Sequence, residues 1–165
     1  LTLSGNNTME NSLIEQTRQS EKLKAYSSRF GELEYHEKDK VIFPKGLFGF
    51  EHLHEYLIIE RDNSKPFVWL QSLEIPGIAL PIVDPLFFKP DYEVEIHIND
   101  LKEIEVDDIS QARTFVIATI PQGNPQDISL NLLGPIIINA ENRKAMQIAL
   151  TDSEYGTKFY LLRNY

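Results

Sequence analysis

Short apolar runs separated by glycine, proline, asparagine and aspartate fill the chain from about residue 22 to its end. Apolar residues hardly ever recur there at the three- and four-residue spacing of a helix, whereas short runs bounded by turn residues are typical of β-strands. The predicted strands are residues 23–35 with a break near Gly31, 40–43, 56–60, 67–73, 78–83, 93–98, 114–120, 128–132, 136–139, 146–150 and 158–162.

Two kinds of strand can be distinguished by their pattern. In residues 93–98 the acids Glu93 and Glu95 alternate with apolar residues, which predicts a strand with one face in water. Residues 115–120 and 136–138 are nearly continuous apolar runs, so we expect them to be covered on both faces at the centre of the core. The pattern predicts an all-β protein: a small closed or partly open antiparallel β-barrel-like fold of about ten short strands with minimal helix.

Turn residues predict how the strands are connected. The proline-glycine pair in residues 75–78 predicts a tight hairpin with a type II turn, in which Gly77 takes a positive φ. Residues 121–127 and 140–144 are polar and are expected to form exposed loops. Residues 107–111 predict one helical turn with acids at its N-terminus.

The beginning of the chain follows a different pattern. Residues 1–8 precede Met9, and their serine, glycine and asparagine content indicates either a cloning remnant or a flexible leader. The residues that follow are rich in glutamine, glutamate and serine, which predicts a frayed helix at most. We therefore expect a flexible N-terminal extension over residues 1–21 and one β-barrel domain over residues 22–165.

Composition narrows the function. Hydrophobic residues make up 42% of the 165 residues, enough for one compact core. Cysteine is absent, which excludes disulfides, thiolate zinc sites and a cysteine nucleophile, and favours a cytoplasmic location. No run approaches the roughly 20 apolar residues that cross a bilayer. A formal charge of −9 disfavours nucleic acid as a direct partner and favours a basic protein.

Most of that charge lies in one stretch, residues 91–108, which we call the acidic segment. It holds eight acids against Lys102 alone, a net charge of −7. Two interpretations remain open: a surface that attracts a basic partner, or a device that protects an edge strand from aggregation. The acids are Asp91, Glu93, Glu95, Asp100, Glu103, Glu105, Asp107 and Asp108.

The sequence contains little that is typical of a catalytic or cofactor-binding site. The four histidines do not form a metal-binding motif, although His52 and His54 could lie on one face of a strand. There is no nucleophile elbow, no phosphate-binding loop and no dinucleotide fingerprint. The paired acids of the acidic segment have polar surroundings, unlike the desolvated carboxyl that a glycosidase needs. We expect no enzyme activity, no cofactor and no metal.

Several blocks in order resemble one known family. Residues 43–51 (FPKGLFGFE) are similar to the motif FPxGIPGFE, with Phe48 where that motif has proline. Residues 66–74 (PFVWLQSLE) and 80–85 (LPIVDP) are similar to PFxxLQSxE and FxVxDP. Residues 131–139 (NLLGPIIIN) are similar to NLxAPIVIN, with glycine for the usual alanine. Residues 30–33 and 147–150, together with Tyr155, are similar to an opening strand and a closing segment. From about residue 22 to 162 the chain thus resembles the FliW family of bacterial flagellar assembly factors.

The resemblance implies a β-barrel-like protein without catalytic activity that works in the cytoplasm by partner switching. FliW proteins bind flagellin, and they also bind CsrA, the carbon storage regulator that represses flagellin translation. When flagellin is secreted, the freed protein captures CsrA and releases the flagellin message. The implied partners are flagellin and CsrA, with no direct contact to nucleic acid or membrane.

Candidate partner contacts come from three sources. On the glycine-rich loop, Leu47 and Phe48 are expected to be exposed apolar anchors. Polar residues within the matching blocks either satisfy backbone groups at turns or contact a partner; these are Gln71, Ser72, Glu74, Asp84, Asn131 and Asn139. CsrA presents a basic surface to RNA, so part of the acidic segment is expected to face it, represented by Glu93, Glu95, Asp107 and Asp108.

Two other function classes are kept as alternatives. A small β-barrel could bind a metabolite in its interior, which requires a cavity there. An enzyme could use Asp84 with His52 or His54, which requires the carboxylate to lie near an imidazole.

Overall fold

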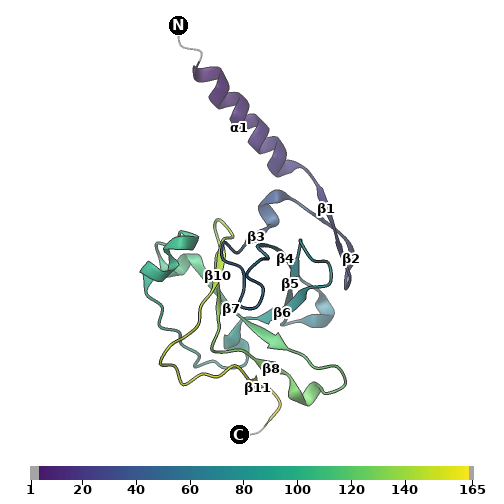
Figure 1. The fold of residues 1–165 in the computed structure, drawn as a ribbon, viewed down its shortest axis with the longest axis vertical. Coiled ribbons are helices and arrows are strands. Elements are labelled where there is room, and N and C mark those ends of the chain that lie inside the picture. The colour runs from purple at the N-terminus through teal and green to yellow at the C-terminus, as the bar shows by residue number, and fades with distance from the viewer. Residues whose placement is uncertain (1–3, 164–165) are drawn as a thin grey trace.

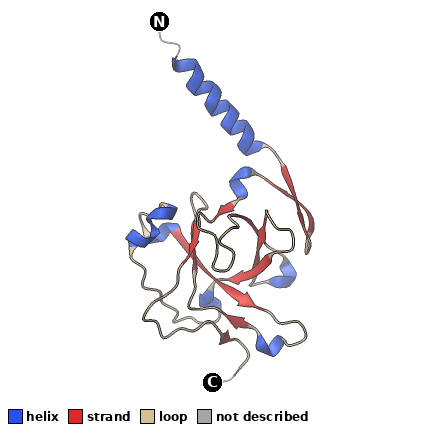
Figure 2. Cartoon of the chain, viewed as in Figure 1, coloured by secondary structure: helices blue, strands red, loops and turns tan. Residues whose placement is uncertain are grey.

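The computed structural model describes residues 4–163 and shows a β-rich body from which one helix projects (Figures 1 and 2). The strands are β1 (Leu23–Ser27), β2 (Gly31–Tyr35), β3 (Val41–Ile42), β4 (Glu55–Ile59), β5 (Val68–Ser72), β6 (Ala79–Val83), β7 (Ala112–Thr119), β8 (Ser129–Leu130), β9 (Ile136–Asn139), β10 (Ala145–Gln147) and β11 (Phe159–Tyr160). The β-rich class and most strand positions are therefore confirmed.

One antiparallel sheet forms the body. Its strand order is β10-β9-β7-β6-β5-β4-β3, with β8 placed beside both β7 and β11, while β1 and β2 form a separate hairpin. The two ends of this sheet approach each other, because Ile42 forms a parallel bridge with Lys144 and its N–H donates to the carbonyl of Arg143 over 3.0 Å. A single bridge does not make a ladder, so the sheet is not a closed barrel.

The interior of the sheet is filled by side chains. The rings of Phe43 and Tyr56 meet edge to face at a centroid distance of 5.3 Å, and Leu70 and Ile82 are buried with them. Residues 136–138 are all buried, as predicted, but the same prediction for residues 115–120 is wrong at its end, because Thr119 and Ile120 are exposed. A metabolite-binding barrel would need a cavity in this interior. Among the described residues, packed apolar side chains fill it instead.

The predicted strand at residues 93–98 is wrong. This segment is extended, but it has no ladder partner among the described residues, and a helical turn begins at Ile98. The alternation itself is real: Val94 and Ile96 are half-buried, whereas the intervening acids are exposed. Period-two burial shows that an extended chain lies on an apolar surface, but it does not show that the chain is hydrogen-bonded into a sheet.

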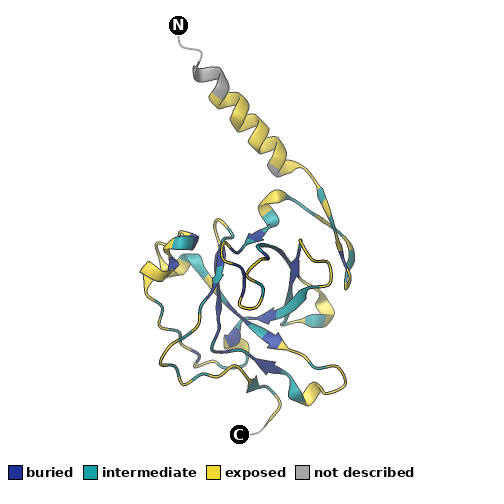
Figure 3. Ribbon diagram, viewed as in Figure 1, coloured by how far each residue is buried: buried dark blue, intermediate teal, exposed yellow. Residues whose placement is uncertain are grey.

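Helical structure is more extensive than predicted. Helix α1 (Ser4–Ser20) is continuous rather than frayed, and its described side chains are exposed (Figure 3). Good helix formers such as leucine, methionine, glutamate and arginine favour it although none of its described side chains is buried. The short 3-10 helices are η1 (Glu37–Asp39), η2 (Asp62–Ser64), η3 (Pro85–Phe87), η4 (Ile98–Ile104), η5 (Ile109–Gln111) and η6 (Pro125–Asp127).

The connections largely follow the turn residues. The tight turn at residues 75–78 is confirmed by the N–H of Ile78, which donates to the carbonyl of Ile75 over 3.1 Å. Its type is wrong, because Gly77 lacks the positive φ of a type II turn. The helical turn predicted at residues 107–111 is confirmed as η5.

Candidate protein-binding site

The acidic segment is held on the body by its apolar residues. After an extended stretch it forms η4, then turns at Glu105 and enters η5. The side chains of Leu101, Ile104 and Val106 are buried and pack with Ile137 of β9. Because these residues take up the inner side of the segment, its carboxylates are directed towards solvent.

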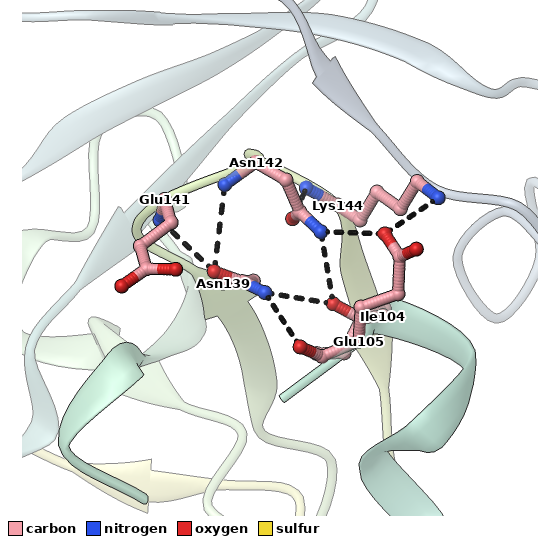
Figure 4. A network of polar contacts seen from close by, with 6 residues as sticks. All are labelled: Ile104, Glu105, Asn139, Glu141, Asn142 and Lys144. Atoms are coloured by element: carbon pink, nitrogen blue, oxygen red, sulfur yellow. Dashed lines mark hydrogen bonds and ion pairs between the residues drawn. The ribbon is translucent and has the colours of Figure 1, made fainter. Parts of the chain in front are cut away.

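Asn139 fixes the end of η4 (Figure 4). Its buried side-chain amide donates to the carbonyl oxygens of Ile104 over 2.9 Å and of Glu105 over 3.2 Å. Its Oδ1 accepts from the N–H of Glu141 over 2.9 Å. Asn142 adds a hydrogen bond to the Glu105 carboxylate over 2.8 Å. Asn139 is therefore a structural residue rather than a partner contact.

Glu105 turns the chain with a left-handed backbone conformation, at a φ of 60°. Its carboxylate pairs with the ammonium group of Lys144 over 2.9 Å. The hydrogen bond and charge of Lys144, together with the hydrogen bond from Asn142, lower the pKa of this carboxyl below its ordinary value. The same side chain thus ties the acidic segment to the β9–β10 turn.

Negative charge remains in surplus on this surface. Besides Glu105, Asp91 pairs with Lys89 over 3.0 Å and Glu103 pairs with Lys45 over 3.1 Å. The other five acids have no ion pair within residues 4–163; they are Glu93, Glu95, Asp100, Asp107 and Asp108. Most of the segment's charge is therefore available to a partner.

The four acids predicted as partner contacts differ in their surroundings. Glu93 and Glu95 are exposed and border a surface hollow that Asp152 and Glu154 also line. Asp108 caps η5, because its Oδ1 accepts from the N–H of Ser110 over 2.9 Å. This backbone hydrogen bond lowers the pKa of the Asp108 carboxyl. Asp107 is exposed beside it.

An apolar groove of about 410 Å³ lies between the acidic segment and β7. We call it the β7 groove. Val94, Ile96 and Leu101 line it from the acidic segment, and Phe115 and Ile137 line it from the sheet. The residue pattern gave no direct sign of this groove, because it depends on how an unpaired extended segment lies across two strands.

The rim of the β7 groove carries exposed apolar and charged groups. Leu86 of η3 is 51% exposed and Ile109 of η5 is 65% exposed. Asp84 also lines the groove, as does Arg113, whose guanidinium group lies 5.0 Å from the ring centroid of Phe115. The half-buried carboxylate of Asp84 accepts from the N–H of Leu86 over 3.0 Å and so caps η3.

The two predicted loop anchors have opposite environments. Phe48 is 54% exposed and stays available as an anchor. The expectation for Leu47 is wrong, because its side chain is 1% exposed and belongs to the central core. Gly46 and Gly49, with φ values of +70° and +87°, let the loop fold back so that one of two neighbouring apolar residues enters the core.

Gln71 and Ser72 are likewise corrected. Both are buried, and Gln71 accepts from the Ser27 hydroxyl over 2.6 Å while its amide donates to the carbonyl of Pro76 over 3.2 Å. The Ser72 hydroxyl oxygen accepts from the N–H of Ile75 over 2.9 Å. These side chains anchor the β1–β2 hairpin and the β5–β6 turn, so they are not accessible to a partner.

The remaining polar candidates mainly satisfy backbone groups. Glu74 is exposed, and its carboxylate accepts from the N–H of His54 over 2.8 Å. Asn131 accepts from the N–H groups of Leu133 and Gly134 over 3.2 and 3.1 Å. Glu74 could still contact a partner through its free surface, whereas Asn131 holds a turn.

His54 and Asp84, two of the candidate catalytic residues, each have a local structural contact, and no metal-binding cluster is found among the described residues. Across residues 4–163, no group of three or more histidine, cysteine, aspartate or glutamate side chains is placed to hold a metal ion. The Nδ1 of His54 lies 2.8 Å from the carbonyl oxygen of Phe43, and Asp84 caps η3, so each has a separate local role. Within the same part of the chain, no helix combines the length and apolarity needed to cross a bilayer.

Comparison with known proteins gives a consistent result. The protein family described as FliW protein matches residues 24–161. A flagellar assembly factor FliW from Thermosipho africanus (strain TCF52B) is 40% identical over 136 residues, which cover 82% of this chain and 94% of the relative. One from Caldanaerobacter subterraneus subsp. tengcongensis is 42% identical over 138 residues, covering 82% and 91%. The crystal structure of a flagellar assembly factor FliW superposes with a TM-score of 0.79 at 30% identity, covering 86% of this chain and 99% of that one.

Proposed function

The chain belongs to the FliW family of flagellar assembly factors, and on this premise we propose that it is a non-enzymatic cytoplasmic regulator that binds flagellin and CsrA. Binding of the two partners is exclusive in this proposal: secretion of flagellin frees the protein to capture CsrA, which relieves repression of flagellin synthesis. We place this function in the β-rich domain, residues 22–165, and regard residues 1–21 as an extension, since the family match begins at residue 24.

The observation that supports CsrA as a partner is the fixed acidic segment. Its net charge of −7 is carried on an extended stretch, on η4 and on the turn that leads into η5. Leu101, Ile104 and Val106 bury the inner side of the segment, and Asn139 fixes its turn. A preorganised negative surface attracts a basic protein and repels RNA, so it can compete for a surface that otherwise binds RNA.

Charge reversal tests this proposal. We expect Glu95→Lys combined with Asp107→Lys to weaken CsrA binding roughly tenfold at low salt, and less at high salt, because exposed charges mainly act at long range. The matched control is Glu10→Lys combined with Glu15→Lys. It changes the net charge equally, at exposed sites on α1 that are distant in sequence from the acidic segment. Calorimetry measures the CsrA affinity of each variant at two salt concentrations. The proposal is contradicted if both variants bind CsrA with the same affinity as the unmodified chain.

A second measurement tests partner switching. Purified flagellin added to a complex of this chain with CsrA is expected to release CsrA, as followed by gel filtration. A stable complex of all three proteins would show that the partners do not exclude one another, and failure to bind either partner would remove the proposed function.

A further inference from the structure

We propose that the β7 groove receives a segment of a protein partner that carries bulky apolar side chains flanked by lysine or arginine. This inference rests on the proposed function and locates a docking site for one of its partners. Apolar contacts in the groove would add to the attraction between the acidic segment and a basic partner.

Exposed apolar side chains lie at the β7 groove. Leu86 and Phe87 of η3 are 51% and 67% exposed, and Ile109 on η5 is 65% exposed. Leu86 and Ile109 both line the groove, whose floor includes the buried ring of Phe115. Contiguous exposed apolar groups around a hollow mark an interaction site more often than isolated ones do. A partner side chain entering here would contact apolar groups from both rims and the floor.

Both rims are held in place by capped turns. Asp84 caps the turn that presents Leu86, through its hydrogen bond of 3.0 Å. Asp108 caps the turn that presents Ile109, and the Gln111 side chain accepts from the N–H of Asp108 over 3.1 Å. Because the anchors are presented by hydrogen-bonded turns, little conformational entropy is lost when a partner binds.

Charge complementarity determines the kind of occupant. The acidic segment forms one wall of the groove, with Asp107 and Asp108 next to Ile109, and Asp84 lies in the lining. Arg113 is also in the lining, but its guanidinium group is stacked on Phe115. The segment that forms this wall has a formal charge of −7, and lysines outside it pair with three of its eight acids, which leaves a negative surplus beside the groove. Cationic residues beside the apolar anchors of a partner would therefore be attracted, and an acidic segment would be repelled.

The test removes the anchors without changing charge. We expect Leu86→Ser combined with Ile109→Ser to weaken binding of flagellin or of CsrA by about tenfold or more, as for interface hot spots. The matched control is Ile75→Ser combined with Leu162→Ser, two exposed apolar residues outside the groove lining, and it is expected to leave both affinities unchanged. Circular dichroism and thermal unfolding of each variant establish that folding is retained.

A crosslinking experiment identifies the occupant in an otherwise unmodified chain. A photoreactive benzoylphenylalanine replaces Phe87, the exposed residue of η3 next to Leu86 of the groove lining, and the crosslinked partner peptide is identified by mass spectrometry. We expect a peptide with bulky apolar residues next to lysine or arginine. An acidic peptide, or unchanged affinities in the groove variant while the unmodified chain binds, overturns the inference and leaves the proposed function intact.

Two further outcomes are distinct. If the unmodified chain binds neither flagellin nor CsrA, the proposed function and this inference both fail. If the unmodified chain is a dimer in solution and the groove variant is a monomer with unchanged partner affinity, the groove is occupied by a second copy, which also overturns the inference.

Discussion

The side-chain amide of Asn139 donates a hydrogen bond to the carbonyl oxygen of Ile104 over 2.9 Å, which joins the end of β9 to the end of η4. The last carbonyl groups of a helix have no partner within the helix and need one from elsewhere. Here that partner is a buried amide at the end of a central strand. The shape of the acidic segment therefore depends on a residue outside it.

We expect Asn139→Ala to lower the free energy of unfolding by about 2–3 kcal/mol, because the hydrogen bonds of its buried side chain to two carbonyl groups and to the N–H of Glu141 are lost. Amide hydrogen exchange should also accelerate in residues 104–108, next to the lost contacts. Asn131→Ala is the matched control, since it removes an asparagine that holds a different turn. Equal exchange rates at residues 104–108 in both variants would contradict the role of Asn139.

Sequence patterns predicted local features of this fold better than long-range ones. The alternation in residues 93–98 identified which side chains face water as far as Ile96, whereas Ile98 is exposed. It did not show that the segment lacks a strand partner, because pairing depends on where distant strands lie. The exposure of Phe48 and the burial of Leu47 differ because two positive-φ glycines fold the loop back. The motif alone does not predict this backbone geometry.

The candidate site shows the same division. The charge of the acidic segment was evident from the sequence, whereas the β7 groove was not, since its walls and rims come from the acidic segment, η3, η5, β7 and β9. Gln71 illustrates the converse error. A polar residue in an apolar strand suggested a partner contact, but its partner is Ser27 of the β1–β2 hairpin. Both relationships join residues that are far apart in the sequence.

The two glycines of the loop over residues 43–51 are expected to differ in how well they tolerate substitution by alanine. A Cβ at Gly46 would lie 2.6 Å from the carbonyl oxygen of Phe50, and its φ is +70°. A Cβ at Gly49 would meet nothing within 4 Å, although its φ is +87°. We therefore expect Gly46→Ala to destabilise by about 3 kcal/mol or more and Gly49→Ala by about 1 kcal/mol. Urea denaturation measures both, and equal losses would contradict the close approach at Gly46.

Glu105 should make stability depend on pH. The hydrogen bond and charge of Lys144 lower its folded-state pKa below the ordinary value of 4.5, so its contribution is fully present above pH 4.5 and is lost as the pH falls through the folded pKa. We expect Glu105→Gln to reduce the melting temperature at pH 7, and the difference from the unmodified chain to shrink progressively below pH 4.5. A difference that grows on acidification would contradict this sign.

The hydroxyl of Tyr56 is buried and has no hydrogen-bond partner among the described residues. Burial raises its pKa to about 12, so the hydroxyl stays protonated at neutral pH. Tyr56→Phe keeps the edge-to-face contact with Phe43 and removes an unsatisfied polar group, so we expect it to stabilise the fold by about 1 kcal/mol.

Tyr92→Phe provides the matched control for this substitution, because the buried Tyr92 hydroxyl donates to the carbonyl oxygen of Leu132 over 2.8 Å. Removing that hydrogen bond leaves a buried carbonyl without its partner and should destabilise by about 1 kcal/mol. Urea denaturation of the two variants at pH 7 should therefore give shifts of opposite sign. If Tyr56→Phe were as destabilising as Tyr92→Phe, the Tyr56 hydroxyl would have to be hydrogen-bonded in solution, and a water molecule inside the core would be the simplest partner.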